Sequence, residues 1–138
     1  MKWGRLLFDL KEEITMSNTL HFKTREDFRT WLMSNCLSNE GVWLLLGKTK
    51  ELVTLKASEA LEEALCFGRI DGLMKRVDDK SYIKYFSTRR KDSKWSPKNK
   101  SLVESLEKRG LMTDFGKAKI EEAKKNGNWD NATNPSAI

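Results

Sequence analysis

The chain contains 138 residues, with 26 Lys or Arg and 20 Asp or Glu, so its formal net charge at pH 7 is +6. A hydrophobic fraction of 38% that includes five tryptophans excludes a disordered chain and suits one domain with one core. No apolar run approaches the roughly 20 residues that span a bilayer, and no signal peptide is recognisable. We therefore expect a soluble, cytoplasmic protein with no transmembrane segment.

We expect a single domain over residues 16–130, preceded by a non-native or poorly ordered extension over 1–15 and followed by a flexible tail over 131–138. The two consecutive glutamates before Met16 can be encoded by a purine-rich ribosome-binding sequence, at a spacing that suits initiation at Met16. The alternative is a short N-terminal helix that packs four apolar side chains on the domain: Trp3, Leu6, Leu7 and Leu10.

Strand and helix patterns alternate in the first half of the domain. Residues 20–22 predict a short strand, and an amphipathic helix follows with Thr24 as its N-cap. The apolar run 42–46 is typical of a central strand covered on both faces. Thr54 is the expected cap of the next helix, which ends at Gly68 in a left-handed conformation. The apolar stripe of that helix is Ala57, Ala60, Leu61, Ala64 and Leu65.

A hairpin and two helices make up the second half. Residues 73–77 and 82–87 predict the two hairpin strands, joined by a turn over 78–81. Each of the following helices is bounded by capping residues: Ser96-Pro97 and Gly110 for the first, Thr113 and Gly127 for the second. These patterns predict an α+β fold, with a small, mostly antiparallel sheet of about four strands, helices packed on one face and two C-terminal helices.

Positive charge is concentrated in the middle of the chain. Residues 69–100 contain eleven Lys or Arg and four Asp, a net charge of +7, so the remainder is close to neutral. The start of a helix presents free backbone N–H groups and binds anions readily, and arginine offers a fork of donors that matches phosphate or carboxylate oxygens. We therefore expect an anion site among Arg89, Arg90, Ser93 and Ser96.

Trp95 lies within this basic segment and allows two interpretations. Its indole could stack on a ligand, or it could anchor the loop in the core, and the second is favoured because large aromatic side chains are buried on average.

Arg69 and Asp71 are expected in a loop between the second helix and the hairpin. Asp71 could orient Arg69 or Arg89, or act as a general base, and Gly72 would allow a ligand to approach closely. The favoured alternative is an Asp-Gly turn in which the Asp71 side chain bonds its own backbone.

Catalysis has little support in the sequence. His21 is the only histidine, and there is no Walker loop, dinucleotide fingerprint or metal-ligand spacing, so we expect no catalytic residue, metal or cofactor. One alternative hypothesis is an enzyme acting on a phosphorylated or acyl substrate, with Asp71 or Cys66 as its working group. Another is nonspecific binding of nucleic acid by the basic segment.

Several short motifs together resemble the YdeI/OmpD-associated family of bacteria, described as bacteriocin-protection proteins. The matching residues span about 20–130 and include Phe28-Arg-Thr-Trp31, Gly41-Val-Trp43, Glu63-Ala-Leu-Cys-Phe-Gly68, Ile70-Asp-Gly72, Arg89-Arg90, Ser93, Trp95-Ser96, Asn99 and Gly127-Asn-Trp129. The family usually has Trp where this chain has Arg69 and Pro where it has Thr88, so this chain carries more positive charge in that region.

The resemblance implies a link to tolerance of bacteriocins and cationic antimicrobial peptides, and it brings no catalytic residues or cofactor. Because like charges repel, a basic protein would not trap cationic peptides directly, and we expect an indirect role. Our leading hypothesis is a non-catalytic protein that binds a phosphate-containing or acidic ligand or partner. The expected binding residues are Arg69, Asp71, Arg89, Arg90, Ser93, Trp95, Ser96 and Asn99.

Overall fold

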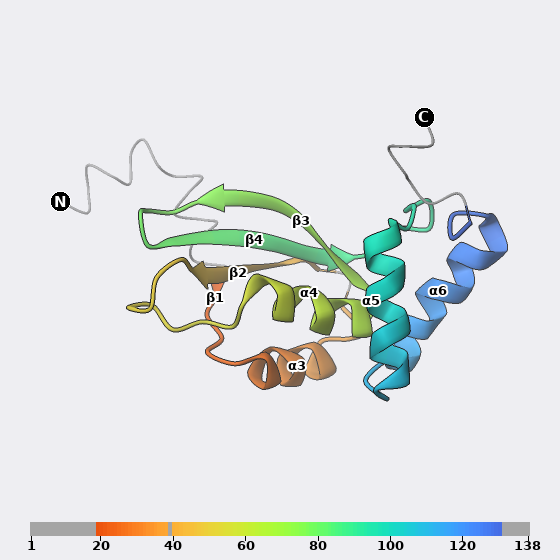
Figure 1. Ribbon diagram of the computed structural model, residues 1–138, viewed down its shortest axis with the longest axis horizontal. Coiled ribbons are helices and arrows are strands. Elements are labelled where there is room, and N and C mark those ends of the chain that lie inside the picture. The colour runs from red at the N-terminus through yellow and green to blue at the C-terminus, as the bar shows by residue number, and fades with distance from the viewer. Residues whose placement is uncertain (1–18, 39, 131–138) are drawn as a thin grey trace.

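The fold is α+β, as the sequence predicts. In the computed structural model, which describes residues 19–38 and 40–130, a four-stranded sheet packs against two helices on one face, and two further helices stand at one end of it (Figure 1). The extension expected over 1–15 and the tail expected over 131–138 lie outside the described residues. The elements in chain order are β1 (Thr19–Leu20), α3 (Arg25–Ser34), β2 (Val42–Gly47), α4 (Ala57–Cys66), β3 (Arg69–Arg76), β4 (Ser81–Thr88), α5 (Pro97–Lys108) and α6 (Asp114–Asn126).

The sheet order is β1-β2-β4-β3, with β1 parallel to β2 and the other two pairs antiparallel. This arrangement confirms that the apolar run after Gly41 forms an inner strand, and that β3 and β4 form a hairpin. The expected cover on both faces of β2 is wrong, because the residues of its second face are only partly buried. Side chains alternate across β2, so that Val42, Leu44 and Leu46 are buried. They meet α3 and α4 through Phe28 and Leu65 in a continuous core.

Capping side chains start three of the helices as expected. The hydroxyl oxygens of Thr24, Ser96 and Thr113 accept hydrogen bonds from backbone N–H groups one turn later, which satisfies donors that the helix itself leaves free. Gly68 and Gly127 have positive φ angles of 74° and 84°. Because such angles suit glycine best, both can end a helix and redirect the chain at once.

Thr54 is not the cap of α4, contrary to expectation. The N-cap is Lys56, whose backbone N–H donates to the Glu59 carboxylate at the third helical position. The Thr54 hydroxyl instead accepts a hydrogen bond from Gly47 N and donates one to Leu55 O, both at 2.9 Å. It therefore closes the loop after β2 and starts no helix.

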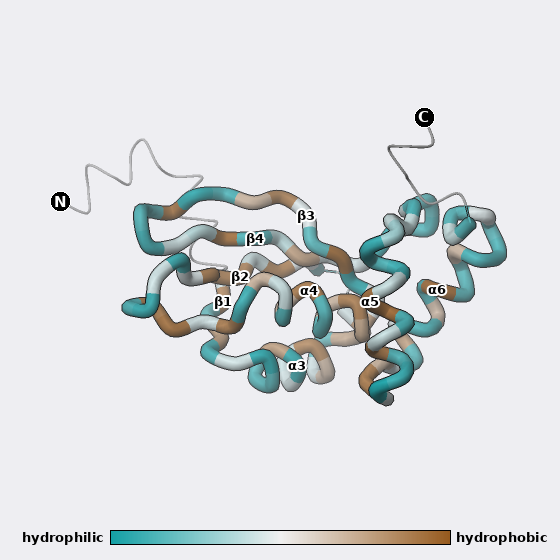
Figure 2. The backbone as a smooth tube through the Cα atoms, in the orientation of Figure 1, coloured by the Kyte–Doolittle hydropathy of each residue, from teal (hydrophilic) through white to brown (hydrophobic). Residues whose placement is uncertain are grey.

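The hairpin also starts earlier than predicted. The chain turns at Gly68 directly into β3, so Arg69 and Asp71 pair across the sheet with Thr88 and Phe86 and do not form a connecting loop. The register shifts between Asp71 and Met74, which indicates a bulge at that point. In Figure 2 the hairpin turn and much of α5 and α6 have the teal colour of hydrophilic residues, in contrast with the apolar residues of β2.

Candidate anion-binding site

Arg89 occupies the junction between the sheet and the two C-terminal helices. Its backbone N–H donates to Gly68 O at 2.9 Å, which fixes the chain as it leaves β4. The side chain is buried, with 3% of the residue exposed, and its Nη1 donates to Ser93 Oγ at 2.6 Å and to Lys94 O at 3.4 Å. The Cζ atom lies 3.8 Å from the centroid of the Trp95 ring, close enough for a cation–π interaction.

The charge of Arg89 has no compensating carboxylate in direct contact among the described residues. Its Nε and Nη2 atoms are buried and find no hydrogen-bond partner in that part of the chain. Burial lowers the pKa of Arg89 to about 10, which the negative charge of Asp71 opposes only in part. A buried guanidinium with unused donors is energetically costly, so it requires either a structural or a functional explanation.

Trp95 packs in the core, in agreement with the favoured interpretation. It is 1% exposed, its ring centroid lies 5.2 Å from that of Trp129, and its backbone N–H donates to Asn128 O. The indole Nε1 is also buried without a partner among the described residues. Trp95 thus anchors the loop on the residues that follow α6, and the guanidinium of Arg89 lies over its ring.

The first turn of α5 is largely satisfied by its own cap. Ser96 Oγ accepts from Asn99 N at 3.1 Å, Ser96 O accepts from Lys100 N at 3.0 Å, and Pro97 has no N–H to offer. Among the backbone amides of this first turn, only the Lys98 N–H has no acceptor in the described part of the chain. Ser96 and Asn99 therefore cap the helix. The start of α5 has fewer free N–H groups to donate to an anion than the sequence suggests.

Arg69 does not join Arg89. Its Nη1 donates to Glu40 O at 2.9 Å, and its Nη2 donates to Asn35 O and Ser38 O at 3.2 and 3.1 Å. The guanidinium also lies over the ring of Trp31, and burial lowers the pKa of Arg69. Arg69 therefore holds the segment after α3 against β3, and its two terminal nitrogens are occupied by backbone carbonyls.

The Arg69→Lys variant is expected to loosen the segment that follows α3. A single ammonium cannot reproduce the fork that reaches three carbonyls, so amide hydrogen exchange at Cys36, Ser38 and Glu40 should rise about tenfold or more. Exchange in β4 should stay unchanged, which serves as the internal control. Equal protection of these three amides in both proteins would show that Arg69 does not hold the segment.

Asp71 forms an ion pair that the sequence did not indicate. Its Oδ2 lies 2.9 Å from Lys84 Nζ on the neighbouring strand, so the expected Asp-Gly turn is wrong. No bond joins Asp71 to Arg69 or Arg89 among the described residues. Cys66 is fully buried, and burial raises the pKa of its thiol, so it is poorly suited to act as a nucleophile.

A second charged cluster joins α3 to α4, and sequence analysis missed it. Glu63 is 3% exposed and accepts hydrogen bonds from Arg25 Nε at 2.7 Å and Arg29 Nη1 at 2.9 Å. Burial alone would lower the pKa of Arg25, but hydrogen bonds to Glu62 and Glu63 outweigh this effect and raise it. The sequence shows two arginines four residues apart on one helix and two adjacent glutamates on another. It does not show that these two helices pack together, so the ion pairs could not be predicted.

The model of the family described as "Domain of unknown function (DUF8412)" matches residues 20–119. The chain belongs to this DUF8412 family. The match includes Arg89, Trp95 and Ser96, whereas Asn126, Asn128 and Trp129 lie beyond it. No curated protein and no solved structure matches the chain significantly. The family description names no activity, so functional inference depends on the site itself.

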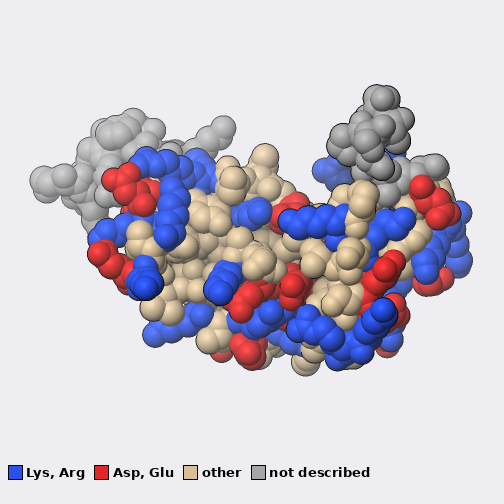
Figure 3. Space-filling model, viewed as in Figure 1, with Lys and Arg blue, Asp and Glu red and all other residues tan. Residues whose placement is uncertain are grey.

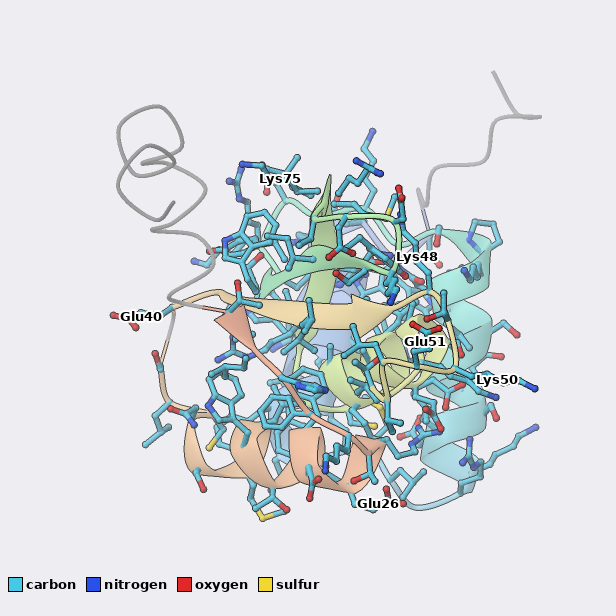
Figure 4. All side chains as sticks on the ribbon, turned by 90° about the vertical axis from the view of Figure 1, so that its left-hand side faces the viewer. Glu26, Glu40, Lys48, Lys50, Glu51 and Lys75 are labelled. Carbon is cyan, nitrogen blue, oxygen red and sulfur yellow. The ribbon has the colours of Figure 1, made fainter. Side chains whose placement is uncertain are left out.

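In the DUF8412 domain, the basic residues of the hairpin and those of the segment 89–100 differ in whether they form ion pairs. On the hairpin, Arg76, Lys80 and Lys84 each contact an acidic side chain, and Figure 3 shows basic and acidic groups next to each other there. Viewed from that end, Lys48, Lys50 and Glu51 lie together in the loop after β2 (Figure 4). By contrast, the basic residues between 89 and 100 have no ion pair with a described acidic residue: Arg89, Arg90, Lys91, Lys94, Lys98 and Lys100.

Two further findings concern the described part of this DUF8412 protein. None of its helices is both long and apolar enough to pass through a bilayer. No group of three or more His, Cys, Asp or Glu side chains within residues 19–38 and 40–130 is arranged to hold a metal ion.

Proposed function

We propose that this DUF8412 protein is a non-catalytic, cytoplasmic binding module that uses the segment from Arg89 to Lys100 to hold an anion or an acidic partner. Like the YdeI/OmpD-associated proteins that its sequence resembles, it would support tolerance of bacteriocins or antimicrobial peptides indirectly. The observation that carries this proposal is a set of four exposed cations in this segment that lack ion pairs with described acidic residues: Arg90, Lys91, Lys94 and Lys98. Unpaired surface cations attract acidic partners and steer their association.

The positions of these residues support a surface role. Arg90, Lys91 and Lys94 are exposed, and they project from a loop that is fixed at both ends. The side-chain amides of Asn126 and Asn128 donate to Lys91 O at 2.8 and 3.0 Å, which ties the loop to the end of α6. A loop that is already ordered loses less conformational entropy when a partner binds.

The enzyme hypothesis receives less support from the same geometry. Of the two groups proposed for catalysis, Cys66 is buried in the core and the Asp71 carboxylate is paired with Lys84. Neither group meets the requirement of an exposed, reactive side chain in a pocket.

The triple variant Arg90→Ala/Lys91→Ala/Lys94→Ala tests the proposal. We expect its affinity for fluorescent poly-glutamate, measured by anisotropy at low ionic strength, to fall about tenfold, since three exposed charge pairs at about 0.5 kcal/mol each amount to roughly one decade. Binding by the unmodified protein should weaken as salt is added, because exposed charges are screened.

A matched control removes the same net charge from exposed positions elsewhere: Lys23→Ala/Lys50→Ala/Lys108→Ala. This variant should keep most of the affinity. Equal losses in both variants would show that net charge alone causes binding, and absence of binding by the unmodified protein would refute the proposal. A single-stranded oligonucleotide that outcompetes poly-glutamate at equal charge would favour the nucleic-acid alternative.

A further inference from the structure

Beside the loop that follows β4, three buried donor nitrogens have no hydrogen-bond acceptor among the described residues. They are Nε and Nη2 of Arg89 and Nε1 of Trp95, and both residues are at least 97% buried, with exposures of 3% and 1%. The Cζ atom of Arg89 lies 3.8 Å from the centroid of the Trp95 ring, so the donors belong to two side chains in direct contact. Buried polar groups are almost always hydrogen-bonded, and a group of three unused donors, one side chain carrying a full charge, is a strong exception.

The unused donors of Arg89 have a defined geometry. Nη1 donates to Ser93 Oγ and Lys94 O, which leaves the edge of the guanidinium formed by Nε and Nη2. Their N–H bonds run parallel and match two oxygens of one carboxylate or phosphate group. Donors of this kind select a ligand that only accepts hydrogen bonds and that carries negative charge.

We propose that Arg89 and Trp95 form a specific site for a small oxyanion, a phosphate or carboxylate group, held by the Nε–Nη2 edge of Arg89. The inference rests on the proposed function, because the exposed cations around the loop would concentrate such anions near the site. A bound oxyanion supplies the negative charge that the buried guanidinium lacks. The lowered pKa of Arg89, to about 10, agrees with a charge that the protein alone does not compensate.

The oxyanion reaches this site when the loop over residues 90–94 moves. Ser93 Oγ and Lys94 O both contact the guanidinium, so the loop covers Arg89 directly. Its outer side is held by the Asn126 and Asn128 amides on Lys91 O, contacts that are exposed to solvent and easily exchanged for water. The buried position restricts the ligand to a small group or to the end of a longer acidic molecule.

The test follows the side-chain N–H signals of the full chain by ¹⁵N NMR during titration with inorganic phosphate and, separately, with acetate. The Arg89 Nε–H and Trp95 Nε1–H signals, assigned with Arg89→Lys and Trp95→Phe, should shift together and saturate at millimolar anion. The Nε–H signal of Arg69 should not move, because that guanidinium already binds three carbonyls. A response to phosphate alone identifies a phosphoryl ligand, and a response to acetate alone identifies a carboxylate.

The Arg89→Met variant separates this site from the exposed surface. It should weaken phosphate binding more than tenfold and lower the affinity for poly-glutamate less than the Arg90→Ala/Lys91→Ala/Lys94→Ala variant does, because Arg89 is buried and those three side chains are exposed. Arg90→Gln, which keeps Arg89, should weaken phosphate binding less than Arg89→Met does. The proposed site is overturned if neither anion shifts the Arg89 signal in the unmodified protein, a result that does not depend on whether any variant folds. Loss of poly-glutamate capture in the Arg90→Ala/Lys91→Ala/Lys94→Ala protein, with intact Arg89 shifts, would support the surface function independently.

Discussion

Replacing Arg89 with methionine is expected to raise the free energy of unfolding by about 1–3 kcal/mol, because a buried, uncompensated charge gives way to an apolar side chain of similar length. The losses are the hydrogen bonds from Nη1 to Ser93 Oγ and Lys94 O and the cation–π contact with Trp95. Ser93 is half-buried and can bond water instead. Chemical denaturation at neutral pH measures the change. Binding residues often destabilise the unliganded protein, because the side chains that function requires are not the ones that stabilise the fold best.

The matched comparison is Arg69→Met, which removes the other buried arginine. Its guanidinium is bonded to three carbonyls, so the same substitution should lower the free energy of unfolding by about 2–4 kcal/mol. The two variants therefore change stability in opposite directions. A loss of stability in Arg89→Met similar to that in Arg69→Met would show that Arg89 is a structural residue.

The pH dependence of the Arg89 contribution has a definite sign. Burial lowers the pKa of Arg89 from its ordinary value to about 10 in the folded protein, so the charged form is disfavoured by folding. The penalty is present in full below the folded pKa and declines as the pH rises from about 10 towards the unfolded value. The gain from Arg89→Met should therefore stay constant between about pH 6 and pH 9.

The Glu63→Ala variant is expected to lower the free energy of unfolding by about 3–5 kcal/mol. Removal of one partner from a buried ion pair leaves the other charge without compensation, and here two arginines lose their shared carboxylate. Arg25 and Arg29 retain some access to water, which places the expected cost nearer the lower limit. Denaturant unfolding monitored by tryptophan fluorescence gives the value directly.

The neighbouring variant Glu62→Ala is the control. Glu62 also contacts Arg25, at 2.8 Å, but its side chain is 22% exposed and its loss should cost about 1 kcal/mol or less. If both variants lower the free energy of unfolding by the same amount, the buried position of Glu63 adds nothing to the strength of its ion pairs. Both residues lie on α4 and share Arg25 as a partner, so the difference between the variants measures the combined effect of burial and of the second close arginine, Arg29, at Glu63.

Much of the fold was predictable from local patterns. Alternation and apolar runs located β2 and the hairpin, and hydroxyl caps located the starts of α3, α5 and α6. Thr54 misled because a threonine before a helix can equally hydrogen-bond the strand that precedes it, as it does with Gly47 N. The start of β3 was missed because Arg69, Asp71 and Gly72 have low strand propensity, and pairing with β4 overrides that preference.

The candidate site was predictable only in part. The concentration of charge near Ser96 was visible in the sequence, and so was the core position favoured for Trp95. What the sequence could not show was how the two arginines differ in their hydrogen-bond partners, because those partners are set by the folded chain. Arg69 meets carbonyls near residue 40, whereas Arg89 meets an indole ring and finds no carboxylate in contact.

The bulge in β3 has a consequence for self-association. Among the described residues β3 pairs only with β4, so its other side is an edge of the sheet, and Leu73 and Met74 are 73% and 65% exposed there. A straight apolar edge would template strand addition from another copy and seed aggregation. The register shift between Asp71 and Met74 breaks that template into two short stretches, neither long enough to nucleate a continuous intermolecular ladder.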